Sequence, residues 1–477
     1  MFFNSLQFIF IFLPVALIVY FLLNKLRLLK LATGWLVGIS LFFYSYWNIK
    51  YLPLILASIT FNYLIGQTLI SQERLKINKK ALLIFGIVGN VGLLIYFKYF
   101  NFLIENINIV FHQQFDFMKL MLPLAISFFT FQQISYLVDT YKEKAKDCDF
   151  LTYALFVCFF PHLISGPIVR YEEEVPQILN IKNRVVNWKN LSGGLFLFAI
   201  GLFKKVVIAD LLANSALVGF SDAYNLSILE SWIVIFSYTF QIFFDFSGYT
   251  DMARGIGLMF NINIAQNFNN PYIAKDIQDF WRRWHMTLSR WLKDYVYIPL
   301  GGNRYGNFNT YKNLFLTFLI GGIWHGANLT FIVWGLMHGI GSVINRFWKN
   351  LNKSIPNWFC WVLTFLYINV AWLYFGAKKV ADANNILITA LNPLTFDVPK
   401  IYFPVVKFRE TGHSYGILTI VVIVFAIYFI FNDSFRNFMD KFQPKTKYML
   451  FIVFLMIIVI YNLVKPDYSS SFIYFNF

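Results

Sequence analysis

The chain has 477 residues, of which 58% are hydrophobic and only 13% are charged. Soluble domains are about 45–50% apolar and about 25% charged, so this composition excludes a soluble globular protein and indicates an integral membrane protein. The formal net charge is +16, but the basic residues stand in short loops between apolar runs. That pattern is typical of orientation signals and anionic-lipid contacts, and it argues against a nucleic-acid partner.

Apolar runs long enough to cross a bilayer begin close to the N-terminus. The first run lacks the basic start and the small-residue cleavage site of a signal peptide, so we expect it to remain as a span. In all, we expect about ten to twelve spans of roughly 20 residues. The clear runs lie at about residues 6–24, 31–47, 51–71, 81–103, 118–138, 417–432 and 448–464.

Basic residues alternate between loops in a way that predicts orientation. They cluster at 25–30, 74–80 and 142–146, whereas the loops near residue 50 and at 104–117 carry few or none. Because basic loops stay in the cytoplasm, the N-terminus should lie outside. A basic loop at 436–447 places the C-terminal tail outside as well. We therefore expect a multi-pass protein of the cytoplasmic (inner) membrane.

The chain is expected to form a single membrane domain with a specialised middle. In residues 150–345 the apolar runs are short and are broken by glycine, proline and charge. Irregular backbone and charge at membrane depth are tolerated only inside protein or around a wet cavity, so the active region should lie there. Residues 1–140 and 346–464 would be scaffold helices, with a polar insertion at about 376–416 and an extracytoplasmic tail at 465–477.

The strongest local motif is WRRWHMTLSRWLK at residues 281–293. Placed on a helix, its basic side chains share one side, its tryptophans lie on the opposite side, and His285 sits at the edge of the aromatic stripe. Such a helix could anchor at the cytoplasmic lipid interface. Its guanidinium face would also suit the phosphates of a donor, and the two interpretations are compatible. The basic residues are Arg282, Arg283, Arg290 and Lys293.

A second motif, GGIWHGA at 321–327, interrupts the apolar stretch 314–336. An ionisable residue in such a setting is costly and suggests a function. Burial disfavours charged imidazole, so His325 would stay neutral and could accept a proton. The glycines would allow a sharp bend or a close approach, and we expect Trp324 and Gly326 to shape a cavity. The alternative is a structural histidine bonded to a carbonyl, which is the interpretation we favour for His338.

Two other segments are expected to be mainly structural. Asp245, Asp251 and Arg254 fall within 243–255 and predict a buried ion-pair network that shapes a cavity. The segment PHLISGP at 161–167 predicts a broken helix with a structural His162. The three cysteines show neither a disulfide nor a zinc-site pattern, so no metal site is expected.

The tail SSSFIYFNF at 469–477 places one tyrosine, Tyr474, among aromatic residues. It could be an aromatic plug at the membrane interface. It could instead enter a central cavity from the outer side, and the residues leave both interpretations open.

Together these segments resemble the membrane-bound O-acyltransferase (MBOAT) family. The resemblance is strongest to the bacterial alginate O-acetylase and peptidoglycan O-acetyltransferase branch, and the D-alanyl transferase of teichoic acids is a more distant cousin. The matching blocks are FFPHLISGPIVRY (159–171), FQIFFDFSGYTDMARGIG (240–257), NFNNPY (267–272), DFWRRWHMTLSRWLKDYVYIPLGGNR (279–304) and GGIWHGA (321–327).

The resemblance implies an all-α fold of transmembrane, re-entrant and interfacial helices around a central funnel. His325 matches the family's catalytic histidine, His285 its second motif histidine, and Tyr474 a tyrosine that looks like an acyl relay. The implied donor is a cytoplasmic thioester, acetyl-CoA, with no bound cofactor. The implied partners are an extracytoplasmic transferase and a polysaccharide acceptor. One departure is Gly376, where relatives usually carry an arginine, and it weakens any inference about donor or acceptor from that region.

Two other functions fit parts of the pattern. D-alanyl transfer to teichoic acid is one. A transporter or flippase without bond chemistry is the other, but transporters often show paired broken helices in two halves. Here the unusual polar residues cluster in one central region without a second copy, which favours an enzyme.

Overall fold

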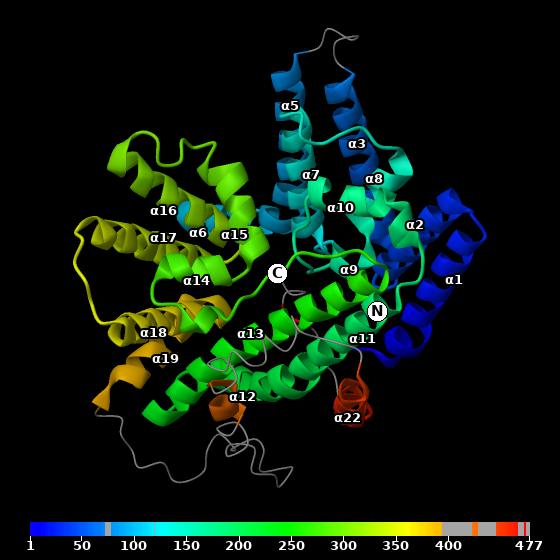
Figure 1. The fold of residues 1–477 in the computed structure, drawn as a ribbon. Coiled ribbons are helices and arrows are strands. Elements are labelled where there is room, and N and C mark those ends of the chain that lie inside the picture. Colours follow the sequence, from blue (N-terminus) through cyan, green and yellow to red (C-terminus); the bar gives the residue numbers. More distant parts are fainter. Residues whose placement is uncertain (72–77, 119, 394–421, 428–444, 466–471, 474–477) are drawn as a thin grey trace.

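Apolar helices make up most of the N-terminal third of the chain. The computed structural model describes residues 1–71, 78–118, 120–393, 422–427, 445–465 and 472–473, and Figure 1 shows their arrangement. The first three runs are helical at nearly the expected bounds. They form η1 (Phe8–Phe12), α1 (Leu13–Lys25), α2 (Leu29–Ser45), η2 (Ile49–Tyr51) and α3 (Leu52–Ile70).

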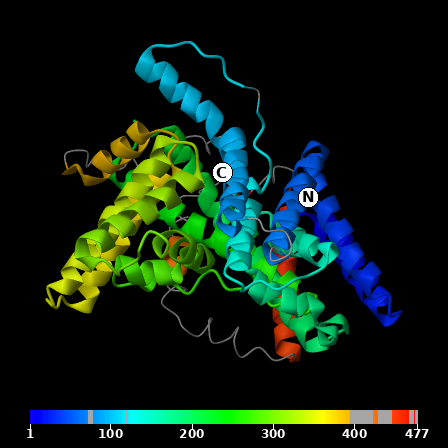
Figure 2. The same ribbon diagram turned by 90° about the horizontal axis from the view of Figure 1, so that it is seen from above.

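The fourth apolar run forms a continuous helix that is longer than expected. α5 (Lys79–Leu94), a π-helical turn η3 (Ile95–Tyr99) and α6 (Phe100–Phe111) follow one another directly. Figure 2 shows the far end of this helix projecting beyond its neighbours. Single π-helical turns occur frequently at functional sites, and this one contains Lys98.

The fifth run becomes helical later than the sequence predicted. α7 (Ile126–Tyr141) starts after Pro123, and proline disfavours helical backbone in the residue before it. Ala125, with a φ of 63°, then turns the chain into the helix. The predicted start at residue 118 was therefore wrong.

The helices in the middle of the chain are interrupted by non-helical backbone, as predicted. α8 (Phe150–Cys158) and the short α9 (Phe160–Leu163) are followed by a non-helical stretch at 164–170. His162 is buried and its Nε2 lies 3.0 Å from Oε1 of the buried Glu174 in α10. This pairing agrees with the structural interpretation of His162. The next elements are α10 (Tyr171–Leu179) and η4 (Ile181–Arg184).

Two helices, α11 (Trp188–Phe203) and α13 (Ile228–Met259), run side by side through the centre of the molecule (Figure 1). Their backbones touch at paired glycines: a Cβ on Gly201 would lie 2.5 Å from the carbonyl oxygen of Gly248, and Gly194 faces Gly255 similarly. Small residues allow membrane helices to approach closely. The link between them contains η5 (Lys204–Ala209) and α12 (Asp210–Ser221).

The predicted amphipathic helix at 281–293 was wrong, because the chain forms two short helices there. α14 (Ile277–Arg283) and α15 (Met286–Leu292) are separated at His285, whose φ of 41° is left-handed and cannot continue a helix. Asn267 holds this break: its carbonyl oxygen accepts the Met286 N–H, and its side-chain oxygen accepts the Thr287 hydroxyl at 2.6 Å.

The aromatic side of this segment faces protein and not lipid. Trp281, Trp284 and Trp291 are all buried, and Trp291 stacks on Phe131 of α7 with ring centroids 3.7 Å apart. The interpretation as a lipid-anchoring helix was therefore also wrong. The flanking short elements are η6 (Pro271–Ile273) and η7 (Lys293–Tyr297).

The C-terminal part begins with a helical hairpin. α16 (Gly306–His325) and α17 (Leu329–Asn350) pack against each other, and α18 (Asn357–Gly376) packs on α17. α19 (Val380–Leu391) and α22 (Thr446–Leu463) follow, and α22 confirms the run predicted at 448–464. Most of the run predicted at 417–432 and the later part of the insertion at 376–416 lie outside the described residues.

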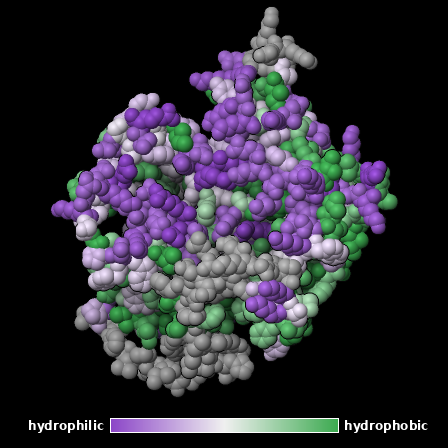
Figure 3. Space-filling model, viewed as in Figure 1, coloured by the Kyte–Doolittle hydropathy of each residue, from purple (hydrophilic) through white to green (hydrophobic). Residues whose placement is uncertain are grey.

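Six of the described helices are long and apolar enough to cross a membrane. Figure 3 shows hydrophobic side chains along the edge where α1 and α2 lie, and hydrophilic ones gathered over the upper half of this face. The all-helical membrane class is confirmed, and the count of ten to twelve spans stays a prediction. The six are Phe8–Lys25, Ile49–Ile70, Lys79–Phe111, Ile228–Met259, Asn357–Gly376 and Thr446–Leu463.

Candidate active site

His325 is the last residue of α16, where the hairpin turns toward α17. Its ring is buried and lies edge-on to three aromatic rings, with centroid distances of 4.9 Å to Trp324, 5.0 Å to Trp334 and 5.1 Å to Phe375. The chain leaves the helix at Gly326, which is extended. An imidazole in this apolar setting is kept from water on several sides, which suits a proton acceptor that must stay neutral.

The glycines before His325 serve packing and do not form a bend. Gly321 and Gly322 lie inside α16. A Cβ on Gly322 would lie 2.5 Å from the carbonyl oxygen of Phe331 and 2.7 Å from the Cα of Gly335 in α17. Of the three glycines expected to allow a sharp bend, only Gly326 lies where the chain turns out of the helix, and the predicted close approach of another backbone is confirmed at Gly322.

A cavity of about 770 Å³ lies at the end of the hairpin away from His325. It is lined by the start of α16, the end of α17 and the segment from α14 to η7. Its basic lining residues are Arg282, Arg290, Lys293, Arg304 and Arg346. We call it the basic cavity. Guanidinium groups arranged in this way suit phosphates, since each can donate two parallel hydrogen bonds.

The four predicted donor-binding residues do not all face this cavity. Arg282, Arg290 and Lys293 line it, but Arg283 does not; its Nε instead donates to Oδ1 of Asp279 at 2.9 Å. Arg290 also holds both carboxylate oxygens of Glu173, at 2.5 and 2.9 Å. Arg282 and Arg283 are consecutive residues of α14 and so point about 100° apart around the helix, and only Arg282 faces the cavity.

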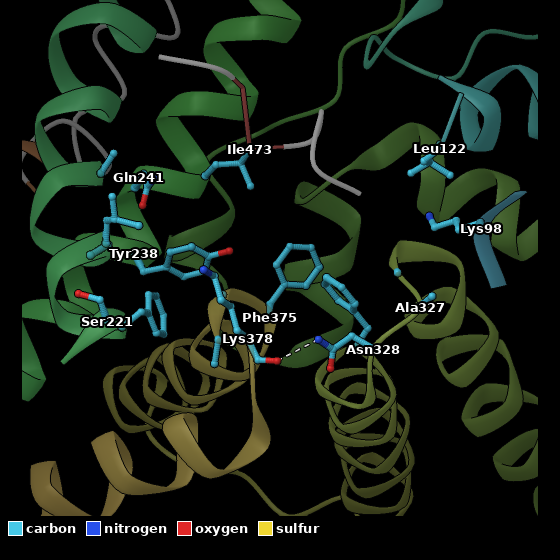
Figure 4. A pocket seen from close by; sticks show the side chains of 18 of the residues that line it. Lys98, Leu122, Ser221, Tyr238, Gln241, Ala327, Asn328, Phe375, Lys378 and Ile473 are labelled. Carbon is cyan, nitrogen blue, oxygen red and sulfur yellow. Dashed lines mark hydrogen bonds between the residues drawn. The ribbon is translucent and has the colours of Figure 1, made fainter. Parts of the chain in front are cut away.

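A second cavity of about 980 Å³ lies at the opposite end of the hairpin, beside His325 (Figure 4). It is lined by Gly326, Ala327, Asn328 and Phe331 at the hairpin turn, together with Phe375. We call it the turn cavity. His325 is not among the lining residues, but its neighbour Gly326 and the ring of Phe375 that contacts it both are.

The elements around the turn cavity come from distant parts of the sequence. Figure 4 shows Lys98 of η3 on one side and Tyr238 of α13 on the other, with Ile473 of the C-terminal tail between the helices. Asn328 donates to the carbonyl oxygen of Lys378 at 2.9 Å, which closes the rim between α17 and the end of α18. Gly326 lines this cavity, and a Cβ there would collide with the Phe331 ring. Its cavity-shaping role stays a prediction.

A row of aromatic and imidazole rings connects the two cavities. Trp281 lines the basic cavity, and its indole N–H donates to Nδ1 of His338 at 3.1 Å. The ring of His338 packs on that of Trp334, with centroids 4.6 Å apart, and the Trp334 ring packs on that of His325, with centroids 5.0 Å apart. The bond from Trp281 agrees with the structural interpretation of His338. Trp324, which also contacts His325, stacks on Phe131 with ring centroids 4.7 Å apart.

His285 is completely buried at the break between α14 and α15. Its ring lies edge-on to Phe246 of α13 at 4.8 Å, and its Nδ1 lies 3.3 Å from the side-chain oxygen of Asn267. It is close enough to His325 for the two rings to interact electrostatically. Both histidines that the sequence singled out are therefore buried, and their rings interact electrostatically.

The predicted ion-pair network exists, with different partners. Asp245 pairs with Lys205 at 2.6 Å, and Asp251 pairs with Lys204 at the same distance. The predicted pair of Asp251 with Arg254 is longer, at 3.9 Å. The two lysines were missed as partners because they precede the carboxylates by about 40 residues, and only the packing of η5 on α13 brings them close.

Sequence analysis also missed Lys98. Its signal was a single lysine inside the fourth apolar run, and such a residue suggests a function by default. In the structure its ammonium donates to the carbonyl oxygens of Trp324 and His325 at 2.7 and 3.0 Å. Tyr474 lies outside the described residues; the residue before it, Ile473, lines the turn cavity.

The described part of the chain is thus a helical membrane protein with buried histidines near a basic cavity and a second cavity. The family model described as MBOAT, membrane-bound O-acyltransferase family, matches residues 11–378, which is most of the chain. The chain therefore belongs to the MBOAT family and is an acyltransferase.

Similar proteins indicate which members of the MBOAT family this chain resembles. The chain is 48% identical over 415 residues to the peptidoglycan O-acetyltransferase of Helicobacter pylori, which covers 81% of this chain and 79% of that protein. It is 38% identical over 434 residues to a protein of Pseudomonas aeruginosa named probable alginate O-acetylase AlgI, which covers 90% and 81%. The similarity to a teichoic acid D-alanyltransferase of Streptococcus thermophilus is 31% over 249 residues and covers 49% and 59%.

Proposed function

We propose that this protein transfers an acetyl group from cytoplasmic acetyl-CoA, across the membrane, for the O-acetylation of an extracytoplasmic polysaccharide. The observation that carries the proposal is the position of His325 between two cavities of different chemistry. The basic cavity lies at one end of the α16–α17 hairpin and the turn cavity at the other. Acetyl transfer is favoured over D-alanyl transfer because the two O-acetylating relatives match over 81% and 90% of the chain, against 49% for the D-alanyl transferase.

The basic cavity supports the proposal as the donor site. Coenzyme A carries phosphates, which Arg282, Arg290 and Lys293 would bind, and its pantetheine arm would point along the apolar wall formed by Trp281 and Phe318. The donor would then lie on the side of the basic loops, which we expect to be cytoplasmic. The N- and C-termini would then both be extracytoplasmic.

The chemistry needs a hydroxyl, a thioester and one base. The hydroxyl oxygen attacks the thioester carbonyl carbon while His325 takes the hydroxyl proton. The C–S bond then breaks, and the imidazolium returns the proton to the coenzyme A thiolate. Tyr474 would supply the hydroxyl, which makes an acetyl-tyrosine ester. His285 would assist by orienting the reacting groups.

A second transfer completes the route. A hydroxyl presented by an extracytoplasmic partner transferase attacks the acetyl-tyrosine ester, which regenerates Tyr474 and passes the acetyl group toward the polysaccharide. The tail residue Ile473 supports this route because it lines the turn cavity next to the hairpin. Either a peptidoglycan or an alginate-like glycan would fit as the final acceptor.

The test is transfer of labelled acetyl from acetyl-CoA by the purified chain in lipid nanodiscs. We expect His325→Gln to lower the rate by about 10²–10⁴-fold, the range for loss of a general base, with unchanged binding of acetyl-CoA. Near-normal transfer by that variant would disprove the assignment of His325. Tyr474→Phe tests the relay separately, since a fully active variant would remove the tail from the mechanism and leave His325 in place.

A further inference from the structure

Two residues of the C-terminal tail are fixed to the centre of the molecule. The backbone N–H of Ile473 donates to Oδ2 of Asp245 in α13 at 3.0 Å. Phe472 is only 1% exposed, and its ring lies edge-on to Tyr249 of the same helix with centroids 4.8 Å apart. The tail thus reaches a helix that lies more than 200 residues earlier in the sequence.

The aspartate that holds the tail belongs to a buried charged cluster. Its other oxygen, Oδ1, lies 2.6 Å from Nζ of Lys205, and that ammonium also lies 2.7 Å from Asp210. The side chains of Lys205 and Asp245 are each only 2% exposed. Lys205 also lies 4.8 Å from the centroid of the Phe472 ring. Both tail residues are therefore contacted by the same cluster.

Such a cluster is not explained by stability alone. Removing two charges from water costs several kcal/mol per ion, and an apolar pair of similar volume is often at least as stable. A carboxylate can, however, bind a lysine with one oxygen and a backbone N–H with the other, and charge-assisted hydrogen bonds of this kind are about twice as strong as neutral ones. The cluster thus has the chemistry of a binding site for extended backbone.

The cluster also opens onto the active region. Asp210 and Ile473 both line the turn cavity, and Figure 4 places Ile473 near Gln241 and Tyr238 of α13. Under the proposed function, a tail held at this position would present Tyr474 to the cavity that adjoins His325. Loss of the contact would leave the cavity intact but would remove the tail from it.

We propose that Asp245, Lys205 and Asp210 form a docking clamp for the C-terminal tail. The clamp binds Phe472 and Ile473 at the turn cavity, and its members are positioning residues that act through the tail. The consequence for catalysis rests on the proposed function, in which Tyr474 carries the acetyl group. The docking itself depends only on contacts of the described residues.

The chain offers a matched control for the clamp. Lys204 and Asp251 form a second ion pair at 2.6 Å between the same two elements, η5 and α13. Among the described residues, no hydrogen bond or ion pair joins either member of this pair to Ile473, and Asp245 and Lys205 are the charged residues that the tail contacts. Neutralising Asp251 therefore removes an equivalent charge from the same helix interface without touching the tail.

The test is hydrogen–deuterium exchange of the C-terminal peptide in the full-length chain in nanodiscs. Asp245→Asn and Phe472→Ala should each speed exchange of the Ile473 amide by about tenfold or more, since opening of the segment no longer breaks the contact. Asp251→Asn should leave that amide protected. Phe472→Ala changes only the tail, so it keeps the test valid should Asp245→Asn fail to fold.

Enzyme kinetics distinguish a role of the clamp in positioning the tail from a general effect on protein stability. In acetyl transfer from acetyl-CoA, both clamp variants should lower kcat with an unchanged KM for acetyl-CoA, and the double variant should lose no more than the worse single one. Equal tail protection in wild type, Asp245→Asn and Phe472→Ala would overturn the clamp. If wild type itself fails to transfer acetyl, the proposed function is wrong, and the exchange experiment still decides whether the tail is docked.

Discussion

The ammonium of Lys98 donates a 3.0 Å hydrogen bond to the backbone carbonyl oxygen of His325. It also donates to the carbonyl oxygen of Trp324 and to the hydroxyl of Ser127, so all three of its hydrogens have acceptors. The last carbonyls of a helix have no partner within the helix, and a lysine there also complements the helix dipole. Lys98 thereby fixes the end of α16 on which the imidazole is carried.

Substitution of Lys98 by methionine should damage catalysis more than donor binding. The change removes one donor from each of two carbonyl oxygens at the end of α16, and the Trp324 oxygen keeps only a 3.4 Å bond from the Tyr99 hydroxyl. Weakening such buried hydrogen bonds costs about 1–3 kcal/mol. Because the basic cavity is at the other end of the hairpin, we expect kcat for acetyl transfer to fall at least about tenfold while KM for acetyl-CoA is unchanged.

Two companion variants make the Lys98 result specific. Lys98→Arg retains donors and charge and should recover part of kcat, whereas Lys80→Met removes an exposed lysine from the start of the same helix and should behave as wild type. Equal losses in Lys98→Met and Lys80→Met would show that the bond to the His325 carbonyl has no role in catalysis.

The basic cavity predicts which arginine matters for the donor. Arg282 lines this cavity, whereas its neighbour Arg283 is bound to Asp279. A charged hydrogen bond to a phosphate is worth about 1.5–3 kcal/mol, so Arg282→Gln should raise KM for acetyl-CoA by about 10–100-fold. Steady-state kinetics at two salt concentrations would measure this change.

The neighbouring Arg283→Gln variant is the control for that experiment. It should leave KM nearly unchanged and instead lower thermal stability slightly, because a partly exposed i,i+4 pair contributes only about 0.3–0.5 kcal/mol. The opposite pattern, with KM sensitive to residue 283 and not to residue 282, would mean that the donor does not occupy the basic cavity.

Sequence reasoning succeeded where single segments carry their own signal. Long apolar runs marked the helices of the scaffold, and the placement of His325 in an apolar stretch correctly indicated a buried imidazole. Both inferences need only local composition and the cost of burying polar groups. The family resemblance then added His285, which the structure places close enough to His325 to interact with it.

Sequence reasoning failed where a contact between distant segments determines the local structure. The helix predicted through 281–293 is broken because Asn267, from a preceding loop, binds the backbone around His285. The clamp partners Lys205 and Asp245 come from different helices, and Lys98 comes from a third region of the chain. Helical periodicity contains no information about such pairs, so neither the break nor the lysines could be found from it.

The left-handed backbone conformation of His285 leads to a further prediction. A left-handed residue other than glycine is strained, and asparagine tolerates this conformation better than alanine does. His285→Asn should therefore preserve the break and the fold but remove the imidazole, whereas His285→Ala should also lower stability by about 1 kcal/mol or more. If the ring takes part in acetyl transfer, both variants will lose activity, although His285→Asn will unfold near the wild-type temperature. An active His285→Asn variant would show that acetyl transfer needs only the backbone turn and not the imidazole.

The contact between Gly322 and α17 gives the last prediction. A Cβ on Gly322 would lie within 3 Å of backbone atoms of Phe331 and Gly335, which cannot move aside as a flexible side chain could. Gly322→Val should therefore push α16 away from α17 and cost about 1–3 kcal/mol from overpacking, with loss of transfer because His325 moves with the helix end. Gly321→Ala is the matched control, since a Cβ there would meet only a flexible Leu292 side chain at 3.2 Å. Thermal unfolding in nanodiscs, together with acetyl transfer, would measure both effects; a stable and active Gly322→Val would show that the hairpin can separate without disturbing the site.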